Sequence, residues 1–424
     1  MIADPPRFAD AAARAREAAA RYPYDAEAAF VLGMMLPFAD QMDESRAAAH
    51  RALELDPQFA TVMVHLGFWA YQMQKFDEAS AEYDRCLALS PTASTCLLRR
   101  ANMHEARGEC AAFEADARRL TQMEPKLPRG HEYLARALAA QGAPVESVRA
   151  ALDRMVETGA DLSPNYSRSF ERFSLAMLVG DLTAAAAAAR DGDRELAAHP
   201  DEVLHANIAG TLSKIAREMG DEAEARHIPE EFERRSAAWT HDAPDALRMW
   251  RLIDQHRAGK TSDAEFEERR DTLYRETMAR RSPPAGSIDA DWIWLHHYTW
   301  DTDSPAEVAD AMAHIKVRGP GVDEWGELGL VYVRAKEYAL AIPSLRRSTR
   351  RCTVMPESVW LFTASTRWYL RTNLFLGEAL EATGDKAGAC VAYGVVTERW
   401  KNAKPRSVTL EEARARAKAL GCAK

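Results

Sequence analysis

The stretch from residue 60 to residue 91, ATVMVHLGFWAYQMQKFDEASAEYDRCLALSP, decides the fold. Two apolar helix-like runs fill it, and the proline that ends it cannot continue a helix. Prolines stand at the same point of successive stretches, 34 residues apart, at Pro57, Pro91 and Pro125. A fixed period of this length is the signature of an array of helical hairpins. We therefore expect each period to fold as two antiparallel helices.

Equivalent positions of each period carry similar residues. The first helix has a leucine followed by a small residue, at Leu32-Gly33, Leu66-Gly67 and Leu134-Ala135. The second helix has two marked positions four residues apart, which lie on one helical face. These pairs are Ser45 with Ala49, Ala79 with Tyr83, Phe113 with Ala117, and Ser147 with Ala151. Small residues at such positions let the two helices of a hairpin pack closely.

This pattern, with its closing proline, resembles the tetratricopeptide-repeat family, most clearly over residues 24–157. The resemblance implies an all-α, tetratricopeptide-type α-solenoid of antiparallel helical hairpins. The third unit departs from the family pattern, because Arg100 stands where leucine is usual and Phe113 where a small residue is usual. We expect that unit to pack less regularly. Two weaker units carry a Gly-Asp turn, at Gly180-Asp181 and Gly220-Asp221.

Along the chain, the pattern predicts two arrays separated by a divergent helical segment. The N-terminal array covers residues 1–236, and residues 237–310 form a spacer that breaks the pattern. The C-terminal array covers residues 311–424, where the pair returns at Leu328-Gly329 and Leu376-Gly377. A solenoid needs a polar terminal helix, and the charged segment Leu410 to Leu420 suits that role.

Composition argues against several classes of protein. A net charge of -9 over 424 residues is not that of a general nucleic-acid binder. No apolar run approaches the roughly 20 residues that cross a bilayer. The N-terminus lacks the basic start and apolar core of a secretory signal. We therefore expect a cytoplasmic protein without membrane insertion.

The six cysteines are irregularly spaced and none forms a CxxC pair. We interpret them as buried free thiols, which behave as small apolar residues. A structural disulfide or a metal site is the alternative. The cysteines are Cys86, Cys96, Cys110, Cys352, Cys390 and Cys422.

The sequence carries no recognisable catalytic set, so we expect no enzyme, no cofactor and no metal site. Gly259-Lys260-Thr261 resembles the end of a phosphate-binding loop, but it lacks the preceding strand and glycine. His296-His297 lies among tryptophans, yet adjacent histidines on a helix point about 100° apart and chelate poorly. A remote alternative is a helical enzyme or metal-binding protein that uses the segment 237–310.

The family resemblance implies that the first helices line a concave groove for a partner protein or peptide. The residues in the contact positions are Phe30, Met34, Val64, Phe68, Tyr71, Asn102, Glu132 and Arg136. This wall begins apolar and turns polar, which favours a peptide or helix with an apolar anchor. The alternative is that the chain's own first helix, residues 6–21, covers part of the wall.

Four arginines, Arg346, Arg347, Arg350 and Arg351, form a dense basic turn. Their i, i+4 spacing suits a phosphate or an acidic peptide. The alternative is a solvated helix face near a helix C-terminus, where cations are favoured anyway.

Residues 376–422 resemble the repeat regions behind bacterial eukaryotic-type serine/threonine kinase domains. That resemblance implies a regulatory or substrate-docking region, although the motifs of the kinase itself are not in this sequence. Neither the identity of the partner nor the oligomeric state follows from these residues.

Overall fold

The computed structural model describes residues 5–36, 41–73, 75–159, 164–196, 202–236, 245–281, 304–314, 327–356 and 365–422. Within these ranges the regular secondary structure is helical, apart from an isolated bridge between Asp181 and Lys404. The N-terminal helices are α1 (Pro5–Arg21), α2 (Ala26–Met35), α3 (Met42–Leu55), α4 (Ala60–Gln72), α5 (Phe76–Leu89), α6 (Ser94–Arg107), α7 (Cys110–Met123), α8 (Pro128–Ala140) and α9 (Val145–Thr158).

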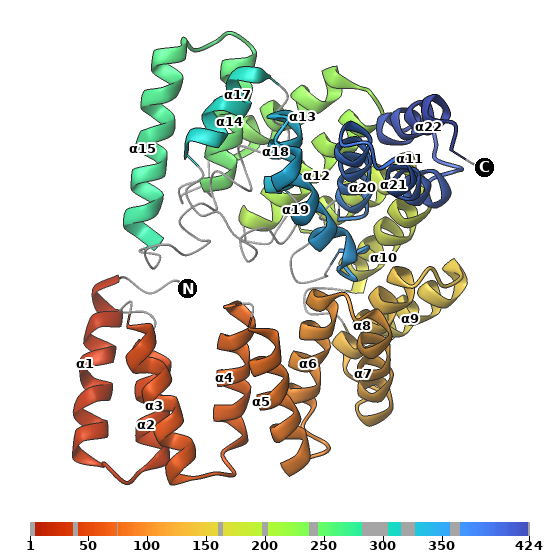
Figure 1. The fold of residues 1–424 in the computed structure, drawn as a ribbon. Coiled ribbons are helices and arrows are strands. Elements are labelled where there is room, and N and C mark those ends of the chain that lie inside the picture. Colours follow the sequence, from red (N-terminus) through yellow and green to blue (C-terminus); the bar gives the residue numbers. More distant parts are fainter. Residues whose placement is uncertain are drawn as a thin grey trace.

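The later helices continue the same arrangement. The middle of the chain forms α10 (Pro164–Val179), α11 (Leu182–Glu195), α12 (Glu202–Glu218), α13 (Glu222–Ser236), α14 (Asp245–Arg257), α15 (Asp263–Arg281) and α17 (Pro305–His314). The C-terminal helices are α18 (Glu327–Arg334), α19 (Tyr338–Arg350), α20 (Ser365–Ala382), α21 (Lys386–Arg399) and α22 (Val408–Leu420). Figure 1 shows successive hairpins stacked side by side. The predicted all-α tetratricopeptide-type solenoid is confirmed.

The three spaced prolines lie in the turns between consecutive hairpins. Pro57 precedes α4, Pro91 precedes α6 and Pro125 precedes α8. At two of these junctions an arginine of the next unit donates a hydrogen bond to the proline. Arg85 donates to the carbonyl oxygen of Pro57, and Arg119 donates to that of Pro91. The 34-residue period therefore appears in the structure as a repeated contact between neighbouring units.

Small residues bring the two helices of a hairpin together, as the sequence predicts. The Ser45 hydroxyl donates to the carbonyl oxygen of Gly33 over 2.6 Å. A Cβ atom added at Gly67 would lie 2.5 Å from the ring of Tyr83, and one at Gly377 would lie 2.2 Å from Tyr393. These aromatic rings occupy the space that a side chain would need.

The third unit accommodates both of its unusual residues. Phe113 is fully buried and packs edge-on against Tyr133, with ring centroids 5.6 Å apart. Arg100 donates to Asp116 over 2.7 and 2.9 Å and to Asp84 over 2.7 Å. The arginine thus replaces an apolar contact with ion pairs to the second helices of two units.

The Gly-Asp turns join helices at three places. Asp181, Asp221 and Asp385 each accept a hydrogen bond from the backbone amide three residues later, at the start of the following helix. The preceding glycines have positive φ angles, 80° at Gly180 and 86° at Gly384. The weaker units predicted from these turns are therefore helical hairpins, α10–α11 and α12–α13.

In the spacer, residues 245–281 form α14 and α15, and the Ser262 hydroxyl accepts from the amide of Glu265 over 3.3 Å. The helix α17 runs on to residue 314. The pair His296-His297 lies outside the described residues.

The C-terminal helices return to pack on the middle of the chain. One hydrophobic core extends from Ala135 in α8 to Ala413 in α22, and a second core covers α2–α8 and includes Cys352. The fully buried Trp400 donates its indole N–H to the carbonyl oxygen of Met177 over 2.8 Å. Figure 1 shows α20–α22 beside α10–α12, although they are far apart in sequence.

The interpretation of the cysteines as free thiols is wrong, because all six are paired. The disulfides join Cys86 to Cys96, Cys110 to Cys352, and Cys390 to Cys422. Their Cα atoms lie 6.3, 5.5 and 5.5 Å apart, within the usual range for a disulfide. Sequence spacing does not reveal such pairs when packing of helices brings distant residues together.

Candidate functional site

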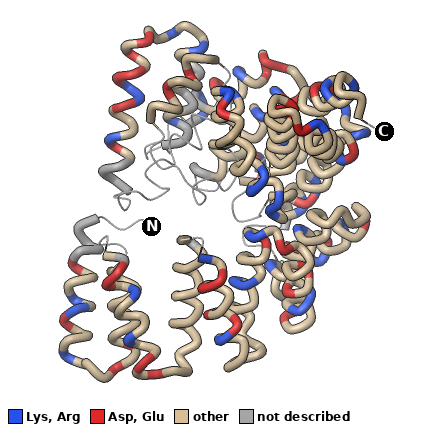
Figure 2. The backbone as a smooth tube through the Cα atoms, in the orientation of Figure 1, with Lys and Arg blue, Asp and Glu red and all other residues tan. Residues whose placement is uncertain are grey.

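Helix α4 is uncharged, and Thr61, His65 and Gln72 are among its few polar side chains. It contains no Asp, Glu, Lys or Arg, although it lies at the surface of the array (Figure 2). One face is buried, with Val62, Met63 and Leu66, while Val64 and Phe68 are partly exposed. A surface helix normally turns a charged face to water. The exposed side of α4 therefore has the composition of a contact surface.

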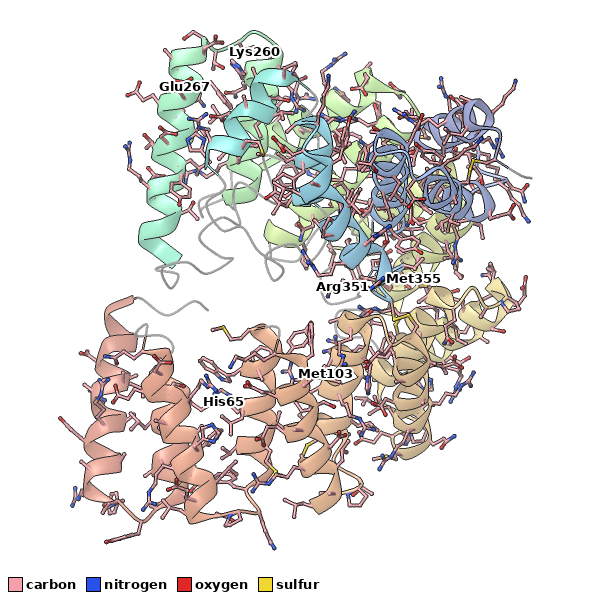
Figure 3. All side chains as sticks on the ribbon, in the orientation of Figure 1. His65, Met103, Lys260, Glu267, Arg351 and Met355 are labelled. Atoms are coloured by element: carbon pink, nitrogen blue, oxygen red, sulfur yellow. A yellow bond between two sulfur atoms is a disulfide. The ribbon has the colours of Figure 1, made fainter. Side chains whose placement is uncertain are left out.

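Aromatic rings from the first two units meet on this side of the array. Phe30 of α2 packs against Phe59 and edge-on against His65, with ring centroids 5.3 and 5.7 Å away. His65, labelled in Figure 3, lies 5.3 Å from the ring of Trp69 on the next turn. Edge-to-face pairs at these distances are favourable. We call Phe30, Phe59, His65, Phe68 and Trp69 the aromatic face.

His65 is neutral at physiological pH. Burial lowers the pKa of His65 to about 4. The indole N–H of Trp69 donates to Nε2 of His65 over 2.6 Å, so that nitrogen is the unprotonated one. The histidine therefore adds a polar ring to the aromatic face without adding charge.

A cation lies at one end of the aromatic face. The guanidinium of Arg99 in α6 lies 4.7 Å from the centre of the Phe68 ring. Cations favour the faces of aromatic rings because of the ring quadrupole. Tyr71 contacts a different ring, that of Phe76, with centroids 6.1 Å apart.

The predicted groove residues fall into two groups. Phe30, Met34, Val64, Phe68 and Tyr71 are all partly exposed on α2 and α4. Phe59, His65, Trp69 and Arg99 lie outside the set predicted from the repeat positions. The uncharged stretch from residue 60 to residue 72 is the sequence signal that indicates His65 and Trp69 as further contact residues.

The polar end of the predicted groove is not a solvent-exposed surface. Glu132 and Arg136 are only 2% and 4% exposed. Arg136 lies 2.5 Å from Glu105, and both side chains are buried. The side-chain oxygen of Asn102 accepts from the hydroxyl of Tyr133 over 2.5 Å. Because Glu132 and Arg136 are buried, the expectation of an open polar flank is wrong at these two residues.

The four arginines lie at the end of α19 and just beyond it. Arg346 and Arg350 are exposed, while Arg347 and Arg351 are partly buried. Arg346 lies 3.7 Å from Asp385, which offsets part of its charge. Figure 3 places Arg351 where the C-terminal helices approach the first units.

A cavity of about 730 Å³ lies between α12–α13, α14–α15 and α17. Arg257 pairs with Glu307 over 2.7 Å, and Arg270 pairs with Asp310 over 2.5 Å. These pairs neutralise much of the charge in the lining. In the part of the chain that the structure describes, no group of three His, Cys, Asp or Glu side chains is arranged to hold a metal ion.

Among the described helices, none has both the length and the apolar character needed to cross a membrane.

No family model matches the sequence, and no curated protein matches it. Several solved structures are similar to parts of the chain. A tetratricopeptide-repeat protein from Parabacteroides merdae is 14% identical, with a TM-score of 0.42, over 60% of this chain and 93% of that one. PilF of Pseudomonas aeruginosa is 17% identical, with a TM-score of 0.38, over 44% and 84% of the two chains. PilW, a type IV pilus biogenesis factor, is 19% identical, with a TM-score of 0.34, over 55% and 87%. None of these likenesses assigns a partner to this chain.

Proposed function

We propose that this protein is a non-catalytic scaffold that binds a segment of a partner protein on the aromatic face. The observation that carries the proposal is the absence of charge on α4, a helix that is partly exposed. Burying its exposed apolar surface would stabilise a complex by about 25 cal/mol per Å² of area removed from water, before the costs of association.

The chemistry of the aromatic face indicates what kind of segment it suits. Phe68 and Trp69 offer ring surfaces for apolar contacts. Because His65 is neutral, the bound segment needs no acidic group opposite it. Arg99 at the edge suits a carboxylate on the bound segment. We therefore expect a peptide or helix with apolar or aromatic anchors and a neighbouring acidic residue.

Selection of binders from a displayed peptide library, followed by fluorescence anisotropy, tests this function. The variant Phe68→Glu/Tyr71→Glu is expected to bind the selected peptides at least about tenfold more weakly, because it charges the apolar surface. The variant Val391→Glu is a matched control, since Val391 is 71% exposed in the other array. Both variants should keep wild-type helicity by circular dichroism.

Two results would count against the proposal. Unchanged affinity of Phe68→Glu/Tyr71→Glu would exclude the aromatic face as the binding surface. A dimer in light scattering that Phe68→Glu dissociates would assign the face to a second copy of the chain instead. The kinase-associated alternative rests on the sequence resemblance of residues 376–422 alone.

We also propose that the protein works in an oxidising compartment. Composition favoured the cytoplasm, but three disulfides are rare in cytosolic proteins and common where thiols are oxidised. Alkylation of protein isolated from its native cells, followed by mass spectrometry without reduction, is expected to find the three pairs. Six alkylated thiols would contradict this proposal and favour the cytoplasm.

A further inference from the structure

The disulfide between Cys110 and Cys352 joins the first units of the solenoid to its C-terminal part. Cys110 is the first residue of α7, and Cys352 lies just after α19, 242 residues further along the chain. The other two disulfides link residues at most 32 positions apart. Of the three bonds, this one alone connects the first units to the C-terminal array.

The segment 350–356 spans the two hydrophobic cores. Cys352 is fully buried in the core of the first units, together with Phe113 and Tyr133. Val354 and Met355 belong to the other core. The hydroxyl of Thr366 at the start of α20 donates to the carbonyl oxygen of Val354 over 2.7 Å. The segment is therefore held by one core on each side.

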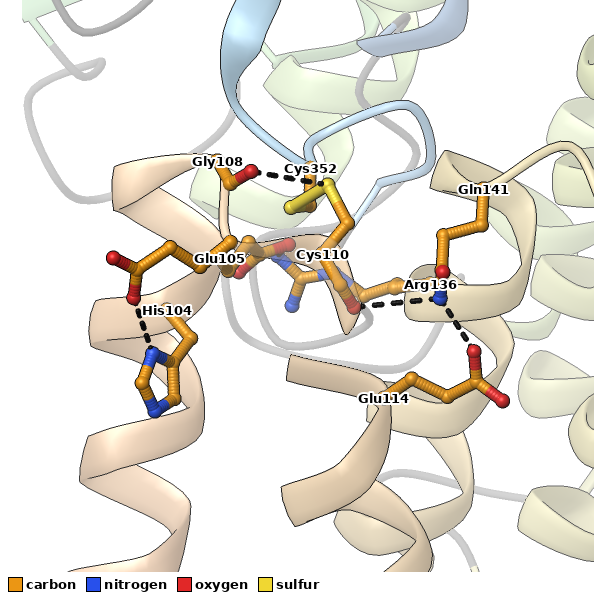
Figure 4. The surroundings of a disulfide bond; sticks show 9 residues. His104, Glu105, Gly108, Cys110, Glu114, Arg136, Gln141 and Cys352 are labelled. Carbon is orange, nitrogen blue, oxygen red and sulfur yellow. Dashed lines mark hydrogen bonds and ion pairs between the residues drawn. A yellow bond between two sulfur atoms is a disulfide. The ribbon is translucent and has the colours of Figure 1, made fainter. Parts of the chain in front are cut away.

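The fit between this segment and α6 is close. The amide of Cys352 donates to the carbonyl oxygen of Glu105 over 3.1 Å. A Cβ atom at Gly108 would lie 2.2 Å from the carbonyl oxygen of Arg350, so the chain approaches α6 where only glycine fits. Figure 4 shows the buried Arg136 and Glu105 next to the disulfide.

Few other contacts link the first units to the C-terminal half. Within the described residues, no helix of α1–α7 packs extensively against α10–α22. By contrast, α8 and α10 are tied to α21 and its end, because Arg399 donates to the carbonyl oxygen of Ala139 and Trp400 to that of Met177. The chain thus consists of a packed part, α8–α22, and a set of first units, α1–α7, that join it through the packing of α7 on α8 and through this disulfide.

We propose that the Cys110–Cys352 disulfide is a redox latch that fixes the first units, α1–α7, against the C-terminal array. When a dithiol reduces it, the segment 350–356 leaves α6 and the surface around Glu105 and Arg136 becomes accessible. Both parts stay folded, because the helices of the first units keep packing on one another and on α8. The latch is independent of what the aromatic face binds.

The chemistry requires only thiol–disulfide exchange. A thiolate of the dithiol attacks one sulfur, and the S–S bond breaks as a mixed disulfide forms. The second thiol of the reagent then attacks the reagent's sulfur in this mixed disulfide and releases the remaining cysteine. Cys110 and Cys352 end as thiols with two electrons and two protons gained, and the dithiol ends as its own disulfide. Cys110 is partly exposed, whereas Cys86 and Cys96 are buried.

Hydrogen exchange and small-angle X-ray scattering on the full chain test the latch. In the variant Cys110→Ser/Cys352→Ser, exchange of the amides at residues 350–356 is expected to rise about tenfold or more, because a local opening governs it. The radius of gyration is expected to increase, while the circular dichroism stays that of the wild type. Wild-type protein treated with dithiothreitol should give the same result once mass spectrometry shows the bond reduced.

The variant Cys390→Ser/Cys422→Ser is the matched control, because it removes a partly exposed disulfide within the last unit. It should leave exchange at residues 350–356 and the scattering curve unchanged. Unaltered exchange and scattering after loss of Cys110–Cys352 would overturn the latch. Loss of helicity in both the variant and the reduced wild type would overturn it too, since the bond would then support folding itself.

Discussion

Arg367 and Glu218 lie 149 residues apart in sequence and form a buried ion pair, with Nε 3.0 Å from Oε2. The same carboxylate accepts from the hydroxyls of Ser407 and Thr409 over 2.6 and 2.8 Å, and from the amide of Thr409 over 2.9 Å. A single side chain of α12 thus holds both α20 and the start of α22. This network and Trp400 fasten the C-terminal array to the middle of the solenoid.

Replacing Glu218 by Gln should destabilise the protein by about 3 kcal/mol, because it removes the buried carboxylate that pairs with Arg367. The measurement is the free energy of unfolding in urea. Glu224→Gln serves as the control, since its pair with Arg190 is exposed and such pairs contribute about 0–1 kcal/mol. Equal effects of the two substitutions would contradict the role given to the buried pair.

The close approach inside a hairpin can be tested with two glycines of adjacent helices. Gly377→Ala should cost about 2 kcal/mol or more, because its Cβ would overlap the ring of Tyr393. Gly394→Ala in α21 has open space around it and should stabilise by about 0.5–1 kcal/mol through helix propensity. Thermal unfolding of the two variants gives the comparison, and a stabilising Gly377→Ala would refute the packing.

The aromatic face should make stability depend on pH. The pKa of His65 is about 4 in the folded protein and near 6.5 when unfolded, so the unfolded chain binds more protons between these values. This contribution is fully present above pH 6.5 and is lost as the pH falls towards 4. Urea unfolding at pH 7 and pH 4.5 should show a smaller loss for His65→Leu than for wild type. An identical loss in both proteins would show that His65 does not titrate in this way.

Gly108→Ala tests how closely the segment 350–356 fits on α6. Its φ of 77° and the nearby carbonyl oxygen of Arg350 both oppose a side chain. A residue forced to positive φ costs on the order of 1 kcal/mol, and the overlap adds to this. We expect dithiothreitol to reduce Cys110–Cys352 faster in this variant, as followed by alkylation and mass spectrometry. Gly142→Ala has a similar φ, 73°, with no neighbour within 4 Å, and should leave the rate unchanged.

The candidate site could be predicted only in part. The place of Phe30 and Phe68 in the repeat predicts that both line the groove, and the structure puts both on the aromatic face. Glu132 and Arg136 occupy equivalent positions of a later unit, yet they are buried. Arg136 pairs with Glu105 of α6 beside the Cys110–Cys352 disulfide, so its environment comes from other parts of the chain. Position within a repeat does not specify such neighbours.

The sequence by itself determined the helical hairpins and their order. Each hairpin forms from contacts within one 34-residue period, such as Gly67 with Tyr83, so local pattern is enough to specify it. Only the tertiary structure decided the pairing of the cysteines, the burial of Arg136 and the union of Glu218 with Arg367. These features depend on segments that come together when the helical units pack into a curved solenoid. The curvature is the total of small rotations between many neighbouring units, and no single period specifies it.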